Sequence, residues 1–237
     1  MLDFFIKRDR LAADFFHAHE VKDDSSPFLI AWTQWAGCPA LAQKLLEGFR
    51  KECPDDLFLV ADMPAVRVRE DLQDKKIDVL FTSRYSAEYM SMSWEHTFLC
   101  TQEITLVRSN RITYAKEELE KYPFFTVPAG ETNEHMTIQR AKDTCAKIGF
   151  VPRNVYICDD LGSAYLNVIT RNGLAFGTEN TSLLPDSNYV LSKTGVYSDY
   201  IMCCPFYPLK PSVVRFRDYI RKSIRKIPHR SIKEAGQ

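Results

Sequence analysis

The chain has 237 residues, of which 45% are hydrophobic and 26% are charged, so it is long enough to bury a substantial core. Lys and Arg total 31, and Asp and Glu also total 31, which gives a net charge of zero. This balance excludes a domain whose main task is to grip a polyanion such as DNA. We find no secretory signal and no run of the ~18 apolar residues that a membrane span needs, and therefore expect a cytoplasmic protein.

The residue patterns of common enzymes and metal sites are missing from the sequence. It contains no P-loop, GxGxxG, GxSxG, HExxH or SxxK motif, which argues against an enzyme and a bound cofactor. The seven cysteines have no CxxC spacing, so we expect no metal site and predict reduced thiols. We interpret the adjacent Cys203 and Cys204 as core packing, and the basic residues of the last helix as a solvated face.

Residues 2–20 predict an amphipathic helix that ends at the polar break before Pro27. Such a helix cannot bury its apolar stripe alone. It either packs on its own domain or serves as a dimerising or connecting helix, and the pattern does not separate the two.

A strand–helix–strand–helix–strand unit follows Pro27. Its elements are predicted at 28–32, 39–51, 57–60, 65–76 and 77–81. The middle of the chain differs, with a half-buried strand at 103–107 and a short helix at 117–121.

The same unit then returns, and its second helix is capped by Asp160. Its elements are a strand at 124–127, a helix at 133–148 that Gly149 stops, a strand at 155–158, the helix after Asp160, and a strand at 174–177. Further strands are expected near 189–191 and 200–204, and a last helix from near Ser212. Two such units predict an α/β protein with two Rossmann-like lobes, whose cleft would hold a small molecule at the carboxyl ends of the strands.

Four stretches resemble the effector-binding domain of LysR-type transcriptional regulators, in the family's order and spacing. Phe49-Arg50 and Pro54 resemble its "F-R-x-x-x-P" ending, and residues 70–81 resemble its "L-x-x-G-x-(I/L)-D" element, although Lys75-Lys76 replace the glycine. YPFFTV resembles the entry into the second lobe, and LGSAYLNVITRNGLAFGTEN resembles a helix–glycine–strand unit.

The resemblance implies the type 2 periplasmic-binding-protein fold and a division of the chain. Residues 1–26 would form a linker or dimerisation helix and residues 27–237 the effector-binding domain. Lobe I would span about 27–107 with part of 178–237, and lobe II about 108–200. No winged helix-turn-helix precedes the first helix, so DNA would be contacted only through a separate or missing domain. Homodimers or homotetramers are implied, with contacts from residues 1–20 and from the helices at 65–76 and 133–148.

Carried over residue by residue, the family's effector site falls on loops after the strands. A helix N-terminus beside such a loop suits a carboxylate, and aromatic side chains suit a planar ligand, so we expect a small acidic or aromatic effector. The expected ligand-binding residues are Thr33, Gln34, Trp35, Gly37, Cys38, Met63, Pro64, Ala65, Thr82, Arg84, Tyr85, Thr126, Pro128, Phe176 and Thr178. Each has an ordinary alternative as a packing, turn or rim residue.

Three other kinds of protein remain open. The first is a solute-binding protein of a transporter, which has the same fold. The second is a free-standing ligand-binding protein, and the third is an enzyme on a similar two-lobed scaffold. The lack of an export signal disfavours the first, and the lack of a nucleophile–base pair disfavours the enzyme.

Overall fold

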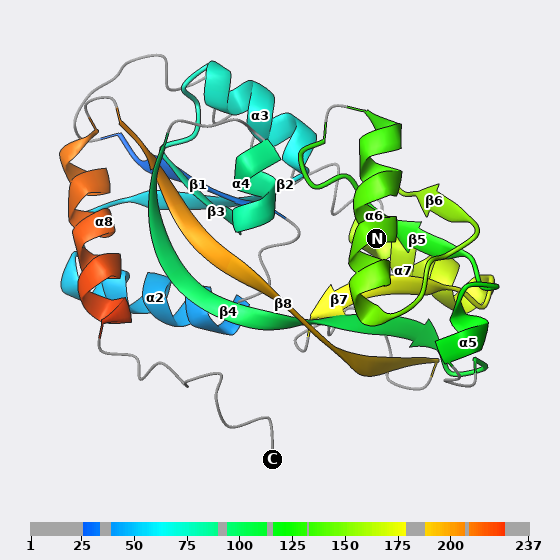
Figure 1. Ribbon diagram of the computed structural model, residues 1–237. Coiled ribbons are helices and arrows are strands. Elements are labelled where there is room, and N and C mark those ends of the chain that lie inside the picture. The colour runs from blue at the N-terminus through cyan, green and yellow to red at the C-terminus, as the bar shows by residue number, and fades with distance from the viewer. Residues whose placement is uncertain are drawn as a thin grey trace.

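The computed structural model describes residues 26–33, 39–89, 94–112, 116–131, 133–178, 188–206 and 209–225. The expected N-terminal helix, with the linker role given to it, therefore lies outside the described residues. Figure 1 shows the two lobes that the alternating pattern predicts, joined by two long strands.

Lobe I contains three parallel strands and four helices. The strands are β1 (Phe28–Thr33), β2 (Phe58–Met63) and β3 (Val79–Ser83). The helices are α2 (Pro39–Glu52), α3 (Ala65–Gln73), α4 (Arg84–Tyr89) and α8 (Pro211–Ile224). α8 returns from the end of the chain, and Lys210, which precedes it, donates to the Asp78 carboxylate at 3.2 Å.

Lobe II repeats this arrangement on a smaller scale. Its strands are β5 (Phe124–Thr126), β6 (Val155–Ile157) and β7 (Leu174–Thr178). Its helices are α5 (Lys116–Leu119), α6 (Glu134–Ile148) and α7 (Leu161–Thr170). The predicted helix ends are confirmed: the Asp160 carboxylate accepts from the Ser163 N–H at 2.7 Å, and Gly149 adopts a left-handed φ of 107° after α6.

All strands belong to one eight-stranded sheet in the order β2-β1-β3-β8-β4-β7-β5-β6. Strands β4 (Trp94–Ser109) and β8 (Tyr189–Pro205) pair antiparallel in its centre and run through both lobes (Figure 1). The sequence predicted only short strands at 103–107, 189–191 and 200–204, which was wrong in length. Polar residues such as Gln102 and Lys193 interrupt the apolar pattern, because the strands lie partly exposed where they cross between the lobes.

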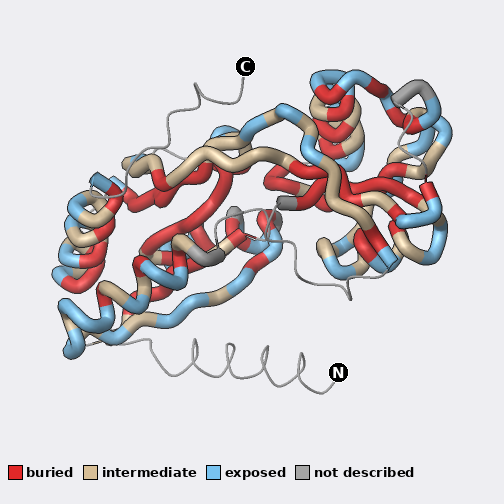
Figure 2. The backbone as a smooth tube through the Cα atoms, turned by 90° about the horizontal axis from the view of Figure 1, so that it is seen from below, coloured by how far each residue is buried: buried red, intermediate tan, exposed pale blue. Residues whose placement is uncertain are grey.

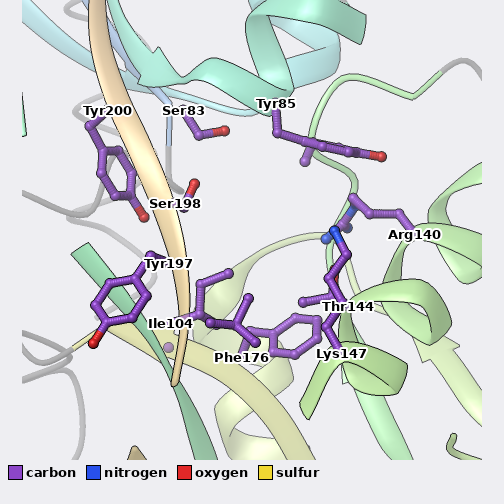
Figure 3. A pocket seen from close by; sticks show the side chains of 13 residues that line it. Ser83, Tyr85, Ile104, Arg140, Thr144, Lys147, Phe176, Tyr197, Ser198 and Tyr200 are labelled. Carbon is purple, nitrogen blue, oxygen red and sulfur yellow. The ribbon is translucent and has the colours of Figure 1, made fainter. Parts of the chain in front are cut away.

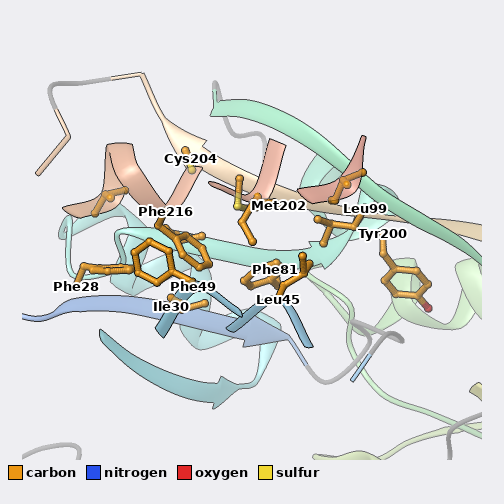
Figure 4. Packing of buried hydrophobic residues seen from close by; sticks show 14 residues of the cluster. Phe28, Ile30, Leu45, Phe49, Phe81, Leu99, Tyr200, Met202, Cys204 and Phe216 are labelled. Atoms are coloured by element: carbon orange, nitrogen blue, oxygen red, sulfur yellow. The ribbon is translucent and has the colours of Figure 1, made fainter. Parts of the chain in front are cut away.

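Helices cover both faces of the sheet in each lobe, so each lobe has two apolar clusters, one on each face. In lobe I, Phe28, Phe49 and Phe216 join β1, α2 and α8, and the rings of Phe49 and Phe216 meet edge-on with centroids 4.9 Å apart (Figure 4). In lobe II, α6 packs on one face through Ala141 and α7 on the other through Tyr165. Figure 2 shows the buried segments along the strands and the exposed ones on the outer faces of the helices. None of the described helices is long and apolar enough to cross a membrane.

Helix α4 was not predicted. The third strand continues past its expected end at Phe81, and the helix begins directly after it. The Ser83 hydroxyl accepts from the Ser86 N–H at 3.1 Å and so satisfies a donor of the first turn. A six-residue helix has too few positions for a recognisable apolar period, so the sequence pattern does not predict it.

Candidate functional site

A cavity of about 140 Å³ lies where the two lobes and the crossing strands meet. Side chains from lobe I, from lobe II and from both long strands form its wall (Figure 3). The lining residues are Ser83, Tyr85, Ile104, Ala129, Arg140, Thr144, Lys147, Phe176, Gly177, Val196, Tyr197, Ser198 and Tyr200. A molecule in this cavity would contact both lobes at once.

A buried ion pair anchors the lobe II side of the cavity. The Arg140 guanidinium on α6 donates to the Glu131 carboxylate, whose side chain is 0% exposed. Arg140 also donates to the Val127 carbonyl at 2.6 Å and to the Thr126 hydroxyl at 3.2 Å. Glu131 accepts from the Ala129 N–H at 2.6 Å. These bonds tie the segment that follows β5 to the side of α6, so this wall is held in one geometry.

Tyr85 brings lobe I into contact with that ion pair. Its ring, on the first turn of α4, lies 5.8 Å from the Arg140 guanidinium carbon, measured to the ring centroid. A guanidinium over a tyrosine face is attracted to the ring, typically by about 0.5–1 kcal/mol where water has access. The contact therefore joins the lobes beside the cavity.

The described part of the wall carries positive charge. Arg140 and Lys147 line the cavity, and none of its described lining residues is Asp or Glu. Glu131 offsets the charge of Arg140, but among the described residues Lys147 has no ion-pair partner. The cavity is thus biased towards an anion. In the part of the chain that the structure describes, no three His, Cys, Asp or Glu side chains gather as metal ligands would.

Comparisons with known proteins find a match in structure but not in sequence. No family model matches the chain, and no curated protein matches it. The effector-binding domain of QuiR, solved with shikimate, superposes with a TM-score of 0.67 at 16% identity, covering 85% of this chain and 98% of that one. The CcmR regulatory domain of Synechocystis PCC6803, solved with 2-PG, gives a TM-score of 0.64 at 12% identity and the same coverage. CbnR, a LysR family transcriptional regulator, gives a TM-score of 0.62 at 15% identity, covering 92% of this chain and 73% of that one.

The chain has the fold of a LysR effector-binding domain. This confirms the predicted two-lobed α/β class of type 2 periplasmic-binding proteins. Identities of 11–16% show a shared LysR-type fold, while the molecule that this chain binds has to be argued from its own residues.

Two of the expected ligand residues lie in the cavity wall of this LysR-type fold, namely Tyr85 and Phe176. Two others lie directly beside it: Thr126 bonds to Arg140, and half-buried Pro128 precedes the lining residue Ala129. Thr178 ends β7, directly after the lining residue Gly177. The cavity thus brings together expected residues from the ends of β3, β5 and β7.

Six of the remaining expected residues are described, and none of them lines the cavity. Thr33 and Thr82 are buried between adjacent strands, with hydroxyl oxygens 3.0 Å apart. Met63 and Ala65 are buried on either side of exposed Pro64. Arg84 points to Asp199, at 3.4 Å. Gln34, Trp35, Gly37 and Cys38 lie outside the described residues, so their part in a site stays a prediction.

The sequence missed the lining residues on α6 and β8. Arg140, Thr144 and Lys147 are spaced as i, i+4 and i+7, which places them on one side of α6. That spacing is visible in the sequence, but these three residues lie beside the buried stripe of α6 through Ala141 and Cys145. They form a cavity wall only because β8 approaches them. Ser198 and Tyr200 fell in a stretch whose strand was predicted too short.

None of the free cysteines that the structure describes has an activated thiol. Cys53, Cys145, Cys158, Cys203 and Cys204 are free thiols, and burial raises the pKa of each. For Cys204 the pKa rises to about 12, so its nucleophilic thiolate is scarce at neutral pH. Cys100, on β4, is disulfide-bonded, which corrects the expectation that every thiol is reduced.

The basic residues of α8 are largely paired. Arg215 donates to Asp56 at 2.7 Å, and both Arg217 and Arg221 reach Glu95. The hydrogen bond from Arg215 lowers the pKa of Asp56 below its ordinary 3.8. These pairs agree with the predicted solvated face rather than with a surface for DNA.

Proposed function

We propose that the chain is the effector-sensing part of a LysR-type transcriptional regulator, which binds a small molecule between its lobes and performs no chemistry. The observation that carries this proposal is the cavity itself, because its wall combines Ser83 and Tyr85 of lobe I with Arg140 and Phe176 of lobe II. The proposed unit comprises residues 27–237, with residues 1–26 as a linker to the DNA-binding domain and to the partner subunit.

The shared fold supports a sensor rather than an enzyme. QuiR and CcmR domains of this fold were solved with shikimate and with 2-PG, which are small molecules. CbnR is a transcriptional regulator, and a CbnR structure contains its target DNA. We propose the same division of labour here, with sensing in this chain, DNA contact through a separate helix-turn-helix domain, and action in the cytoplasm where the DNA lies.

The mechanism would be a shift in population between lobe arrangements. A ligand that touches both lobes stabilises the arrangement in which both sets of contacts are made. The Tyr85–Arg140 contact lies on this boundary and would respond to any change in it. In an oligomer, the lobe arrangement sets the spacing of the attached DNA-binding domains, so binding would alter their contact with a promoter.

An oligomer is also supported by the sheet edges. β2 and β6 are the two edge strands, and apolar side chains are exposed on or next to both: Leu57, Leu59 and Val60 at one edge and Val151 and Tyr156 at the other. Exposed apolar edge strands favour pairing with another chain. We propose a homodimer or homotetramer that covers these edges together with the outer helices α3 and α6. Light scattering after Leu59→Lys should show a smaller particle, whereas an unchanged mass would remove this part of the proposal.

A thermal-shift screen of small carboxylates and aromatic compounds tests the sensor proposal. A ligand that binds only the folded chain raises the melting temperature, by an amount that grows with its concentration over the Kd. Thr144→Trp should fill the cavity and abolish the shift, while Ala146→Trp, on an exposed position of the same helix, should not. A shift that survives Thr144→Trp would place the ligand elsewhere, and chemical conversion of the ligand would mark an enzyme.

A further inference from the structure

The cavity wall has two polar ends and an apolar floor. Arg140, Thr144 and Lys147 lie on one side of the opening in Figure 3. Ser83, Ser198 and Tyr200 lie on the other side, with hydroxyl groups and no charge. The side chains of Ile104 and Phe176 lie between these ends, and Val196 adds to this apolar surface. A ligand that matches the wall is therefore polar at both ends and apolar in between.

The net charge of the wall favours one negative charge on the ligand. The buried Glu131 carboxylate offsets Arg140, and this pair is held by further bonds to Thr126 and Ala129. Lys147 is left as one positive charge that no described carboxylate neutralises. This one exposed, uncompensated cation complements one negative charge on the ligand.

The uncharged end is suited to a hydroxyl group. Ser198 has an oxygen that can both donate and accept, and the Ser83 hydroxyl lies nearby, 2.9 Å from that of Ser86. A hydroxyl on the ligand would find a partner in Ser198, while a bare hydrocarbon end would offer that side chain no hydrogen bond.

We infer that the cavity takes a small monoanion built on a flat ring, with its carboxylate at the Arg140–Lys147 end and a hydroxyl opposite it at Ser198. This inference rests on the proposed sensor function and names the chemical class of its ligand. The cavity volume of about 140 Å³ is below the ~300–1,000 Å³ of sites for drug-sized molecules, which limits the ligand to about one ring. Tyr85 and Phe176 provide aromatic surface for the ring.

Calorimetric titration with three matched probes tests the inference: 4-hydroxybenzoate, its neutral analogue 4-hydroxybenzyl alcohol, and benzoate, which lacks the hydroxyl. We expect 4-hydroxybenzoate to bind about tenfold more tightly than the neutral alcohol, because its carboxylate gains charge-assisted hydrogen bonds. Lys147→Gln should weaken the binding of 4-hydroxybenzoate by about fivefold and leave the alcohol unaffected. In Ser198→Ala, 4-hydroxybenzoate should bind no more tightly than benzoate. Lys142→Gln, on the same helix but outside the wall, is the control and should change neither affinity.

Each outcome decides the inference separately from the sensor proposal. Equal affinities for the acid and the alcohol would overturn it, as would the absence of binding by all three probes. An equal loss of affinity in Lys142→Gln and Lys147→Gln would also overturn it, because the positive charge would then act at long range and not at the cavity wall. If a different compound from the thermal-shift screen still binds and Thr144→Trp blocks it, the sensor proposal stands without this ligand class.

Discussion

The ring of Tyr85 on α4 lies 5.8 Å from the guanidinium of Arg140 on α6, and the two residues belong to different lobes. Arg140 is in turn fixed from behind by the buried Glu131 carboxylate. The contact between the lobes thus joins a guanidinium that is held in place in lobe II to a tyrosine on a short helix of lobe I. It couples the wall of the cavity to the relative position of the lobes.

Replacing Tyr85 tests that coupling. Tyr85→Phe keeps a ring over the guanidinium, so we expect it to bind the ligand found by screening about as well as the original chain. Tyr85→Ala removes both the ring and part of the wall, and we expect its Kd to rise by about tenfold or more in calorimetry. Equal affinities for the Phe and Ala variants would show that the ring has no part in binding.

The Arg140–Glu131 pair should dominate the stability of lobe II. Glu131→Gln leaves a buried guanidinium without its carboxylate, and breaking a buried pair in this way costs about 3–5 kcal/mol of unfolding free energy. Urea denaturation measures this loss. Glu118→Gln removes a partner from the exposed pair with Lys121 and should cost less than about 1 kcal/mol. Similar losses for the two variants would contradict the account of the buried network.

The Thr33–Thr82 contact predicts a non-additive pair of substitutions. The two hydroxyls are buried on neighbouring strands and bond to each other at 3.0 Å. Thr33→Val alone leaves the Thr82 hydroxyl buried without a partner, which costs about 1–3 kcal/mol. Combining it with Thr82→Val removes both polar groups, and the double variant should be no less stable than either single one. A double variant whose loss equals the sum of the single losses would show that the hydroxyls act independently.

The Asp56–Arg215 pair predicts a dependence on pH. The pKa of Asp56 is lowered in the folded chain, chiefly by the hydrogen bond from Arg215, so folding favours the ionised carboxylate. The stabilisation is present above the ordinary value of 3.8 and is lost as the pH falls through the folded pKa. Asp56→Asn should therefore lower the melting temperature at about pH 7 and have less effect at about pH 2.5. Asp55→Asn is the neighbouring control and should not show this dependence on pH. A loss of melting temperature in Asp56→Asn that does not change with pH would contradict the pairing.

The thiols should differ in reactivity according to burial. Burial raises the pKa of Cys145, Cys203 and Cys204, so alkylation at about pH 8 should be slow until the chain unfolds. Half-buried Cys53 should react first, and disulfide-bonded Cys100 only after reduction. Mass spectrometry of the alkylated chain follows each position. Labelling of Cys203 in the folded chain as fast as that of Cys53 would show that the core described here is open.

The lobes could be predicted from the sequence, but the connection between them could not. Buried strands such as 28–33 and amphipathic helices such as α6 are determined locally, by apolar runs, helical periods and capping residues like Asp160. The motif residue Asp78 has a clear physical role, since its carboxylate accepts from the Leu29 N–H at 2.8 Å and thus joins β1 to the start of β3. The length of β4 and β8 depends on contacts between distant strands, which leave no period in either segment.

Part of the cavity wall coincides with residues that the sequence predicted as ligand contacts. Tyr85 follows β3 and Phe176 lies within β7, and the rule that ligands gather near strand ends selected both. Arg140 and Lys147 are on the flank of a helix, where a charged residue ordinarily faces solvent. Their place in the wall follows from the partner that approaches them, the polar stretch of β8 around Ser198.

Hydrogen-exchange mass spectrometry with and without the ligand found by screening tests most directly whether one molecule joins the two lobes. The account predicts that the ligand slows exchange in both lobes together, in the segment around Ser83–Tyr85 and along Ala129–Lys147. Protection confined to one lobe, or located away from these segments, would contradict it.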